Sequence, residues 1–273
     1  MPSVVPTLEL EQELAAQGFD AIVGFDEVGR GSLAGPVMVG CVAIWARDLP
    51  KLQVPAHVAD SKMLTARRRE NMLEDLENWV AAWAVGQASN HEIDEWGISH
   101  ALGIAALRAL THVELQLGAR GSQVPDETQI AAHGKLDLAT AASSATVSAL
   151  RAGEETAAAA DASADGLPLR IGAILDGPYD YITKAVSTFE APDVPIPPHV
   201  VTKVKGDQHC ATVASAAVIA KVIRDHLMMQ LAERPEYAPY QWASNKGYGS
   251  KAHREAIAAY GPCDLHRITW KLS

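Results

Sequence analysis

Residues 21–31 read Ala-Ile-Val-Gly-Phe-Asp-Glu-Val-Gly-Arg-Gly, an apolar run that ends at two acids and a glycine-rich turn. A compact apolar run bounded by turn residues predicts a buried strand over residues 21–25. Residues 36–45 follow the turn and are rich in β-branched side chains, so we expect a second strand that pairs antiparallel with the first. The sheet therefore begins as a hairpin whose first strand ends at carboxylates.

Segments typical of strands and of helices alternate along the rest of the chain. Further strands are predicted over residues 80–88, 170–175 and 199–204, which are apolar or β-branched between turn residues. Helical periodicity is found over residues 8–17, 61–79, 92–117, 211–233 and 250–260. The expected fold class is α/β, with a mixed five-stranded sheet flanked by helices and a C-terminal helical extension.

Residues 118–168 differ in composition from their surroundings. They are rich in Ala, Ser, Asp and Glu and have little apolar periodicity. This composition is typical of a surface insertion or a partly disordered linker. Because a loop of this length is unusual inside a compact domain, we interpret the segment as a decoration without a catalytic role.

The composition limits the class of protein. With 273 residues, of which 48% are hydrophobic and 21% charged, the chain can bury a sizeable core. It has neither an apolar run of about 18 residues nor a secretory signal, so we expect a soluble, cytoplasmic protein without a membrane contact. The three cysteines, Cys41, Cys210 and Cys263, are interpreted as buried thiols because their number and spacing suit neither a disulfide framework nor a zinc site.

The net charge of −10 argues against a protein that coats nucleic acid through bulk positive charge. The charge is uneven along the chain, because residues 199–273 carry ten Lys and Arg against six acids, a net charge of +4. This distribution allows a local basic surface beside an acidic site, and it is equally compatible with ordinary solvated charges.

Acids at the ends of three predicted strands are the main chemical signal. Asp26 and Glu27 follow the first strand, Asp176 follows the strand over 170–175, and Asp207 follows the strand over 199–204. Each acid alone is explained as a residue that favours loops. Four carboxylates gathered at one sheet edge would repel one another unless they held cations, and hard oxygen ligands suit Mg²⁺ or Mn²⁺. Two such ions can stabilise the attacking and leaving oxygens of a phosphodiester displacement.

The glycines after the first strand have two possible uses. Adjacent strand residues face opposite ways, so Asp26 and Glu27 can serve one site only if the strand ends or twists between them. Gly29 and Gly31 would permit such a bend, and they would also let backbone amides approach a sugar or phosphate. The segment lacks both the P-loop pattern and the Gly-x-Gly-x-x-Gly dinucleotide pattern, which removes two common interpretations.

Taken together, these motifs resemble bacterial ribonuclease HII, the type 2 ribonuclease H. The matching motifs include Gly-Phe-Asp-Glu-Val-Gly-Arg-Gly over residues 24–31, Lys-Gly-Asp over 205–207 and Asn-Lys-Gly-Tyr-Gly over 245–249. The other matching stretches, in chain order, are 35–36, 60–62, 174–177, 214–225 and 260–262, with His253, His266 and Arg267. The resemblance covers nearly the whole chain apart from its start and residues 118–168.

The resemblance implies a role for each candidate site residue. Asp26, Glu27, Asp176 and Asp207 would be the catalytic, metal-binding acids, with two Mg²⁺ or Mn²⁺ ions per site. A substrate-binding set would comprise Gly29, Arg30, Gly31, Lys62, Lys205 and Tyr248. In it, the Gly-Arg-Gly backbone senses the ribose 2′-hydroxyl, the tyrosine packs on the neighbouring deoxynucleotide, and Arg30 and the lysines contact phosphates.

The resemblance also implies the organisation and activity of the protein. A ribonuclease H-like catalytic domain over residues 21–233 would follow an N-terminal extension over 1–20 and precede a helical, substrate-gripping region over 234–273. The enzyme would cut the RNA strand of RNA/DNA hybrids and would cut 5′ of ribonucleotides embedded in duplex DNA, leaving 3′-hydroxyl and 5′-phosphate ends. We expect a cytoplasmic monomer that removes misincorporated ribonucleotides and RNA primers, and a contact with a replication clamp is left open.

Alternatives remain for the protein and for single residues. A binding module that keeps the fold without cleaving would be indicated by a missing acid, and all four acids are present. Another two-metal nuclease of the same fold would lack the Gly-Arg-Gly element and Tyr248. Asp225 lies four residues after Lys221, which predicts a salt bridge within a helix rather than a further metal ligand. His253 and His266 are interpreted as structural hydrogen-bonding residues.

Overall fold

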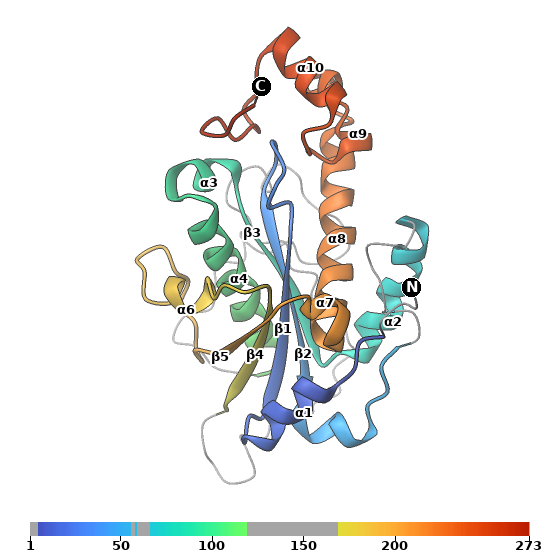
Figure 1. Cartoon of the computed structure of the whole chain (residues 1–273), viewed down its shortest axis with the longest axis vertical. Coiled ribbons are helices and arrows are strands. Elements are labelled where there is room, and N and C mark those ends of the chain that lie inside the picture. The colour runs from blue at the N-terminus through green and yellow to red at the C-terminus, as the bar shows by residue number, and fades with distance from the viewer. Residues whose placement is uncertain (1–4, 56–57, 59–65, 119–168, 273) are drawn as a thin grey trace.

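A five-stranded sheet forms the centre of the computed structural model, which describes residues 5–55, 58, 66–118 and 169–272 (Figure 1). The strand order is β3-β2-β1-β4-β5. The strands are β1 (Ala21–Val28), β2 (Val37–Trp45), β3 (Ala82–Ala88), β4 (Ile171–Asp176) and β5 (His199–Lys203). The predicted mixed five-stranded sheet is therefore confirmed.

β1 is the central strand and joins the two halves of the sheet. It pairs antiparallel with β2, as the predicted hairpin requires, and parallel with β4, which in turn pairs parallel with β5. The parallel ladder between β1 and β4 ends at the pair Phe25 and Leu175, whereas β1 continues to Val28. The prediction that this strand ends at residue 25 was therefore too short. Its last three residues stay in the sheet because they pair with β2.

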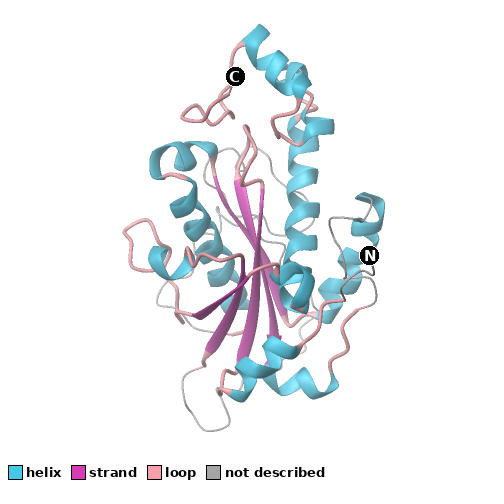
Figure 2. Ribbon diagram, in the orientation of Figure 1, coloured by secondary structure: helices cyan, strands magenta, loops and turns pink. Residues whose placement is uncertain are grey.

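One long helix covers each face of the sheet (Figures 1 and 2). α4 (Ile98–Gln116) packs on β3 and β2, and α8 (Ala211–Leu231) packs on β1 and β2. Strand glycines permit close packing: a Cβ atom added to Gly86 would lie 2.0 Å from the carbonyl oxygen of Ala105, and one added to Gly40 would lie 2.5 Å from that of Ala216. Both helices are therefore held near the sheet backbone at fixed positions.

The shorter helices connect and extend these layers. They are α1 (Glu9–Ala16), α2 (Ala66–Trp79), α3 (Asn90–Trp96), α6 (Ile182–Ala185), α7 (Gly206–His209), α9 (Trp242–Asn245), α10 (Lys251–Tyr260) and the 3₁₀ helices Ala46–Lys51 and Pro235–Tyr240. The single helix expected over 92–117 is wrong in one respect. Gly97, at φ 80°, ends α3, and α4 starts at the next residue.

The C-terminal segments extend beyond the sheet and return to the turn between β1 and β2. In Figure 1, α9 and α10 lie at the far end of α8, above the tip of that hairpin. Backbone bridges join Ser32 to Tyr248 and Ala34 to His266. At the other end of α8, Thr7 forms a backbone bridge to Cys210. The helix α8 thus links the two terminal regions.

The cysteines, the helices and residues 118–168 were each the subject of a prediction from the sequence. The three cysteines are free, with Cys41 and Cys210 buried as expected and Cys263 partly exposed. None of the helices in the described ranges has the length and apolarity that crossing a membrane requires. The insertion lies outside the described residues except for Gly118 at its start, and residues 59–65, which include Lys62, are likewise outside them.

Candidate active site

The predicted acids come from three elements at one edge of the sheet. Asp26 and Glu27 belong to β1, Asp176 is the last residue of β4, and Asp207 is the second residue of α7. Because β1, β4 and β5 are parallel, the ends that lead to these acids point the same way. Glu27 and Asp176 line one pocket with a volume of about 510 Å³.

Asp26 and Glu27 project from opposite faces of β1. Two residues before Asp26, a Cβ atom added to Gly24 would lie 2.5 Å from the backbone of α8. Two residues before Glu27, Phe25 packs in the core on the α4 side. Since side chains alternate along a strand, Asp26 faces α8 and Glu27 faces α4. The strand does not end between them, because β1 continues to Val28.

The end of β4 explains how acids on opposite faces can still serve one site. β4 pairs with β1 only as far as Phe25, so no pairing to β4 continues beside Asp26 and Glu27. On their other side both acids pair with β2. Asp176 stands at the point where β4 ends. Side chains from either face of β1 can therefore reach towards the end of β4.

Asp207 is brought to Asp176 by a tight turn after β5. Lys205 has φ 57°, in the left-handed region, and places the chain at the start of α7. The amide of Gly206 donates a hydrogen bond of 2.7 Å to Oδ1 of Asp176. Asp207 follows directly and is buried. The carboxylate of Asp176 thus fixes the backbone that carries the fourth acid.

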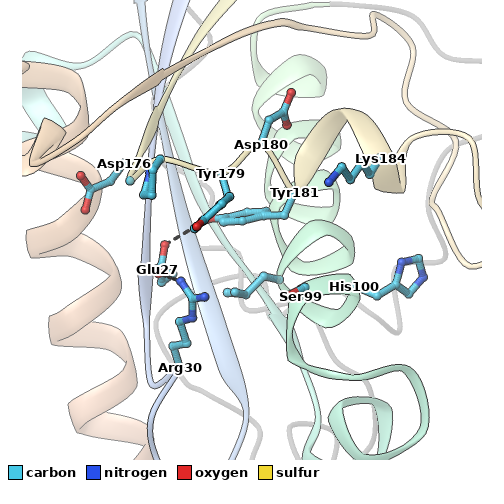
Figure 3. Close-up of a pocket in the computed structure, with 12 residues that line it drawn as sticks. Glu27, Arg30, Ser99, His100, Asp176, Tyr179, Asp180, Tyr181 and Lys184 are labelled. Atoms are coloured by element: carbon cyan, nitrogen blue, oxygen red, sulfur yellow. Dashed lines mark hydrogen bonds and ion pairs between the residues drawn. The ribbon is translucent and has the colours of Figure 1, made fainter.

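Two side chains hold the carboxylate of Glu27 (Figure 3). Nη1 of Arg30 donates to Oε1 at 3.1 Å, and the hydroxyl of Tyr181 donates to Oε2 at 3.2 Å. Burial, and then the negative charges of Glu27 and Asp26, raise the pKa of Tyr181 well above its ordinary value. The phenol therefore stays protonated and remains a hydrogen-bond donor to Glu27 at neutral pH.

The donor chemistry of the four acids fits a hard divalent cation. Their side chains, however, are not close enough together for metal binding in this structure. Within the described ranges, no three His, Cys, Asp or Glu side chains are grouped closely enough to hold a metal ion. The carboxylate of Glu27 is instead bonded to Arg30 and Tyr181, and that of Asp176 to Gly206. Cation binding would exchange some of these hydrogen bonds for metal–oxygen bonds.

The Gly-Arg-Gly turn contains glycines of two different kinds. Gly29 has φ 81°, and a Cβ atom there would lie 2.1 Å from Nε of Arg224, so the fold itself requires glycine. At Gly31 a Cβ atom would meet nothing within 4 Å. In the described part of the chain, the backbone amides of Arg30 and Gly31 have no hydrogen-bond partner. Gly31 therefore leaves open space beside two available donors.

Tyr248 lies against this turn although it is far away in sequence. Its hydroxyl accepts a hydrogen bond of 3.2 Å from the amide of Gly29. The guanidinium of Arg224 lies 5.5 Å and Nζ of Lys221 6.0 Å from the ring centroid. The side chain keeps 37% exposure. An aromatic face thus remains available next to the free amides.

A buried histidine pair supports the backbone of Tyr248. Nδ1 of His253 lies 2.9 Å from the carbonyl oxygen of Tyr248, and Nε2 accepts from the indole of Trp242 at 3.1 Å. Nε2 of His266 completes the pair at 3.1 Å, and its Nδ1 accepts from the amide of Cys263. Burial lowers the pKa of both rings, that of His266 to about 4. Both are neutral at physiological pH and bond internally, which agrees with a structural role.

The charged candidates differ in their surroundings. Arg30 is 52% exposed at its side chain and pairs with Glu27. Lys205 is exposed at the turn before Asp207. Asp225 pairs with Lys221 at 2.6 Å, so the predicted salt bridge within the helix is confirmed.

Three residues that contact this site were given no role in it by the sequence analysis. Tyr181, Arg224 and Arg267 bond to Glu27 or to the turn after β1. Arg224 and Arg267 occur in stretches that carry the family resemblance, yet nothing local marks a basic side chain as buried. Tyr181 follows Asp176 by five residues in a segment without periodicity. Only the tertiary contacts identify these residues.

Comparison with known proteins adds an independent finding. The family model described as Ribonuclease HII matches residues 23–164 and 179–273. A ribonuclease HII of Streptomyces avermitilis is 36% identical over 272 residues, which cover 99% of this chain and 85% of the relative.

Solved structures resemble the chain in fold. The PCNA:RNase HII complex from Archaeoglobus fulgidus matches with a TM-score of 0.53 and 23% identity, covering 92% of this chain and 96% of that chain. Bst-RNase HIII in complex with Mn²⁺ matches with a TM-score of 0.58 and 17% identity, covering 95% and 70% respectively. The architecture described above is thus the mixed sheet with flanking helices of ribonuclease H-like proteins.

Proposed function

Because the chain belongs to the ribonuclease HII family, and is therefore an endoribonuclease of the ribonuclease H class, we propose that it hydrolyses the RNA strand of RNA/DNA hybrids and cuts 5′ of ribonucleotides embedded in duplex DNA. One observation carries the proposal. The pocket lined by Glu27 and Asp176 also contains Arg30, the residue at the centre of the turn with free amides. Carboxylates for phosphodiester chemistry and donors for a sugar hydroxyl are therefore adjacent.

Asp26, Glu27, Asp176 and Asp207 are the residues that would hold two divalent ions, Mg²⁺ or Mn²⁺. When bound, these ions supply an activated water and stabilise the charge that develops on the phosphate. The Mn²⁺ complex of the structural neighbour supports a divalent cation. The expected products carry a 3′-hydroxyl and a 5′-phosphate.

The turn after β1 is proposed to select ribose. The amides of Arg30 and Gly31 can donate to a 2′-hydroxyl oxygen, which deoxyribose lacks. The open space at Gly31 lets the sugar approach the backbone. The exposed face of Tyr248 can pack on the next sugar, and this contact favours an RNA-to-DNA junction.

Basic side chains and the C-terminal region are proposed to hold the duplex. Arg30 and Lys205 flank the acids and are exposed enough to contact phosphates, and Lys62 is proposed for the same role from the sequence alone. Residues 234–273 carry Tyr248 and would act as the gripping region next to the catalytic domain over residues 21–233. The segment 1–20 is proposed as an extension that supports α8.

The cellular role and partners follow from the proposed activity. An enzyme that cuts at single ribonucleotides would act in the removal of misincorporated ribonucleotides and RNA primers, in the cytoplasm and as a monomer. The complex of PCNA with a relative supports a replication clamp as a candidate partner.

The test is a DNA duplex that contains one ribonucleotide, incubated with the full-length protein and Mg²⁺ or Mn²⁺. We expect one cut on the 5′ side of the ribonucleotide, mapped by the size and end chemistry of labelled products. Cleavage only within longer RNA runs would instead indicate a type 1 specificity. Absence of cleavage on every hybrid would contradict the proposal.

A variant distinguishes cleavage from binding. Asp176→Asn should abolish cleavage while hybrid binding and the melting temperature stay close to those of the wild type, because the carboxylate acts through the cations. Asp20→Asn is the matched control, since Asp20 accepts a hydrogen bond from the amide of Arg170 at the opposite end of the sheet. Full activity of Asp176→Asn would refute the site, and it would favour a different catalytic centre.

A further inference from the structure

Two buried arginines lie beneath the turn that is proposed to select ribose. Arg224 comes from α8 and Arg267 from the segment after α10, and both side chains have 0% exposure. Long cationic side chains are rarely buried completely, because removing a charge from water is costly unless it is paired. Their partners therefore show what the fold requires of them.

Arg267 binds the backbone carbonyls at both ends of the turn. Nη2 donates to Gly29 O at 2.7 Å and to Gly35 O at 3.1 Å. Nη1 donates to Arg30 O at 2.9 Å, and Nε donates to Gly35 O at 3.2 Å. Its own amide donates to Leu33 O at 2.9 Å. One planar guanidinium thus joins the start of the turn to its end.

Arg224 binds the middle and the exit of the same turn. Its Nη2 donates to Ser32 Oγ at 2.7 Å and to Ala34 O at 3.3 Å, and its Nε donates to Pro36 O at 3.1 Å. Its Nη1 donates to Lys246 O at 3.0 Å, two residues before Tyr248. The side chain therefore connects the turn to the segment that carries the tyrosine.

The charges of these arginines are compensated by carbonyl dipoles. In the part of the chain that the structure describes, neither guanidinium forms a salt bridge with a carboxylate. Burial, and then the charge of Arg224, lower the pKa of Arg267 to about 9, so it stays charged at neutral pH. Two like charges are thus held together by hydrogen bonds to one loop. Such a loop has little freedom to rotate its peptide groups.

The orientation of the peptide groups has a direct result for the surface. The carbonyls of Gly29, Arg30 and Gly35 point inward to Arg267, and those of Ala34 and Pro36 point to Arg224. Since a peptide unit carries its N–H opposite its carbonyl, inward carbonyls present amides on the other side. The peptide whose carbonyl belongs to Gly29 carries the amide of Arg30, and the next one carries the amide of Gly31.

We infer that Arg224 and Arg267 are positioning residues that set the preference for ribose over deoxyribose, by holding the amides of Arg30 and Gly31 outward and Tyr248 beside them. This inference rests on the proposed function of the turn. It assigns sugar selectivity to side chains that contact neither the cations nor the nucleic acid.

Hydrogen exchange tests the positioning without any need for catalysis. Arg267→Lys and Arg224→Lys keep a positive charge but lose the planar fork that binds several carbonyls. Both should speed amide exchange in peptides that cover residues 29–36, by at least about tenfold if two or more hydrogen bonds are lost. Arg170→Lys is the matched control, because Arg170 also donates to two loop carbonyls, those of Gln17 and Gly18, at the opposite end of the sheet. Unchanged exchange over residues 29–36 in both variants would overturn the inference.

Sugar selectivity is measured separately on two duplexes that differ by one 2′-hydroxyl. In binding measurements with Ca²⁺ in the buffer, the wild type should bind the duplex with one ribonucleotide more tightly than the all-DNA duplex. Arg267→Lys should reduce this preference, and in Mg²⁺ it should lower kcat/KM by about 100-fold, as expected for misplacement of about 1 Å. If the wild type shows no preference and no cleavage, the proposed function fails, and the exchange experiment still judges the arginines.

A milder variant covers the case in which the lysine variants do not fold. Ser32→Ala removes one acceptor of Arg224 and leaves both arginines in place. It should raise exchange over residues 29–36 and reduce the preference for ribose, and it should lower the melting temperature by less than the lysine variants do, because Arg224 keeps its bonds to the carbonyls of Ala34, Pro36 and Lys246. A selectivity equal to that of the wild type, combined with unchanged exchange, would count against the inference.

Discussion

Glu27 is held in place by two neighbours of different chemistry. Arg30 supplies a charged donor from the same turn, and Tyr181 supplies a neutral donor from the segment after β4. A cation that binds Glu27 would compete with Arg30 through charge, whereas the phenol can keep its hydrogen bond to one oxygen. Tyr181 is therefore expected to orient the carboxylate in both states.

Replacing Tyr181 by Phe should weaken the site without disturbing its packing. Loss of one hydrogen bond to a charged group is expected to lower kcat/KM about 3- to 10-fold and to raise the Mn²⁺ concentration needed for half-maximal cleavage. A metal titration with the single-ribonucleotide duplex measures both effects. Tyr179→Phe is the control, since Tyr179 lines the same pocket but is 74% exposed. Equal behaviour of the two variants would show that the phenol has no orienting role.

The placement of the four acids near one another could be predicted from the sequence, because each lies at or just after the end of a recognisable apolar run, and the ends of parallel strands lie together. Arg224 and Arg267 could not be given a role in this way, because their acceptors are backbone carbonyls. The bond from Arg267 to Gly29 spans 238 residues, and no local pattern reports such a pair. The end of the first strand was also predicted too early, since pairing with β2 continues β1 through both acids.

At the scale of elements, α8 depends on a side chain from another helix for its first turn. Its N-cap residue, Cys210, makes no side-chain cap. Oε1 of Glu11 in α1 accepts from the amide of Thr212 at 3.0 Å and from its hydroxyl at 2.9 Å. Glu11 is fully buried, so water cannot replace it. The start of α8, shortly after Asp207, is thereby fixed by α1.

Glu11→Ala should destabilise the protein by about 1 to 3 kcal/mol, because a buried amide and a hydroxyl lose their acceptor. Thermal unfolding should show a midpoint lower by several degrees, about 2 to 4 °C per kcal/mol for a chain of this size. Glu11→Gln keeps an acceptor and should lose less. Glu13→Ala is the control on the exposed side of the same helix. A midpoint for Glu11→Ala equal to that of Glu13→Ala would remove the capping role.

Most elements were predicted to within a few residues, because apolar periodicity reflects the two-faced packing of strands and helices. The helix boundaries that were predicted wrongly have local causes. Gly97 at φ 80° divides the helix expected over 92–117, and the capping box of Ser89 and Glu92 starts α3 earlier than the apolar pattern does. These causes are a backbone angle and a pair of capping hydrogen bonds, neither of which hydrophobic periodicity records.

For the molecule as a whole, a buried carboxyl couples stability to pH. Glu114 in α4 has 0% exposure, and burial raises its pKa to about 8. Its Oε2 accepts from the amide of Ile196 at 3.3 Å, and its Oε1 has no hydrogen-bond partner among the described residues. The folded protein therefore keeps Glu114 protonated at pH 7, whereas the unfolded chain ionises it.

The sign of this effect follows from proton linkage. A folded pKa above the unfolded value gives stability that is complete below about pH 4.5 and is lost as pH rises to about 8. Glu114→Gln removes the ionisable group, so it should stabilise the protein relative to wild type at pH 8, on the order of 4 kcal/mol, with little difference at pH 4.5. Urea unfolding at both pH values measures the difference. A stability difference between variant and wild type that is independent of pH would contradict the assignment.

The insertion can be tested by shortening the chain. It enters after α4 and returns before β4, whose first residue, Ile171, is separated from Asp176 by about 17 Å of extended strand. Replacing residues 121–166 by a flexible Gly-Ser linker should therefore leave kcat/KM on the single-ribonucleotide duplex within about twofold of wild type. Loss of cleavage with an unchanged melting temperature would show that the insertion takes part in substrate binding or catalysis.

The hydrogen bonds of Arg267 also bear on how the protein matures during synthesis. All four acids precede Arg267 in the chain, and the turn it binds precedes it by more than 230 residues. A ribosome therefore completes the four proposed catalytic acids before it completes the residue proposed to order the turn after β1. Contacts between such distant segments carry a larger loop-closure entropy than local contacts do. Under the proposed roles, a nascent chain would thus order this turn only after the segments that carry the four acids have been synthesised.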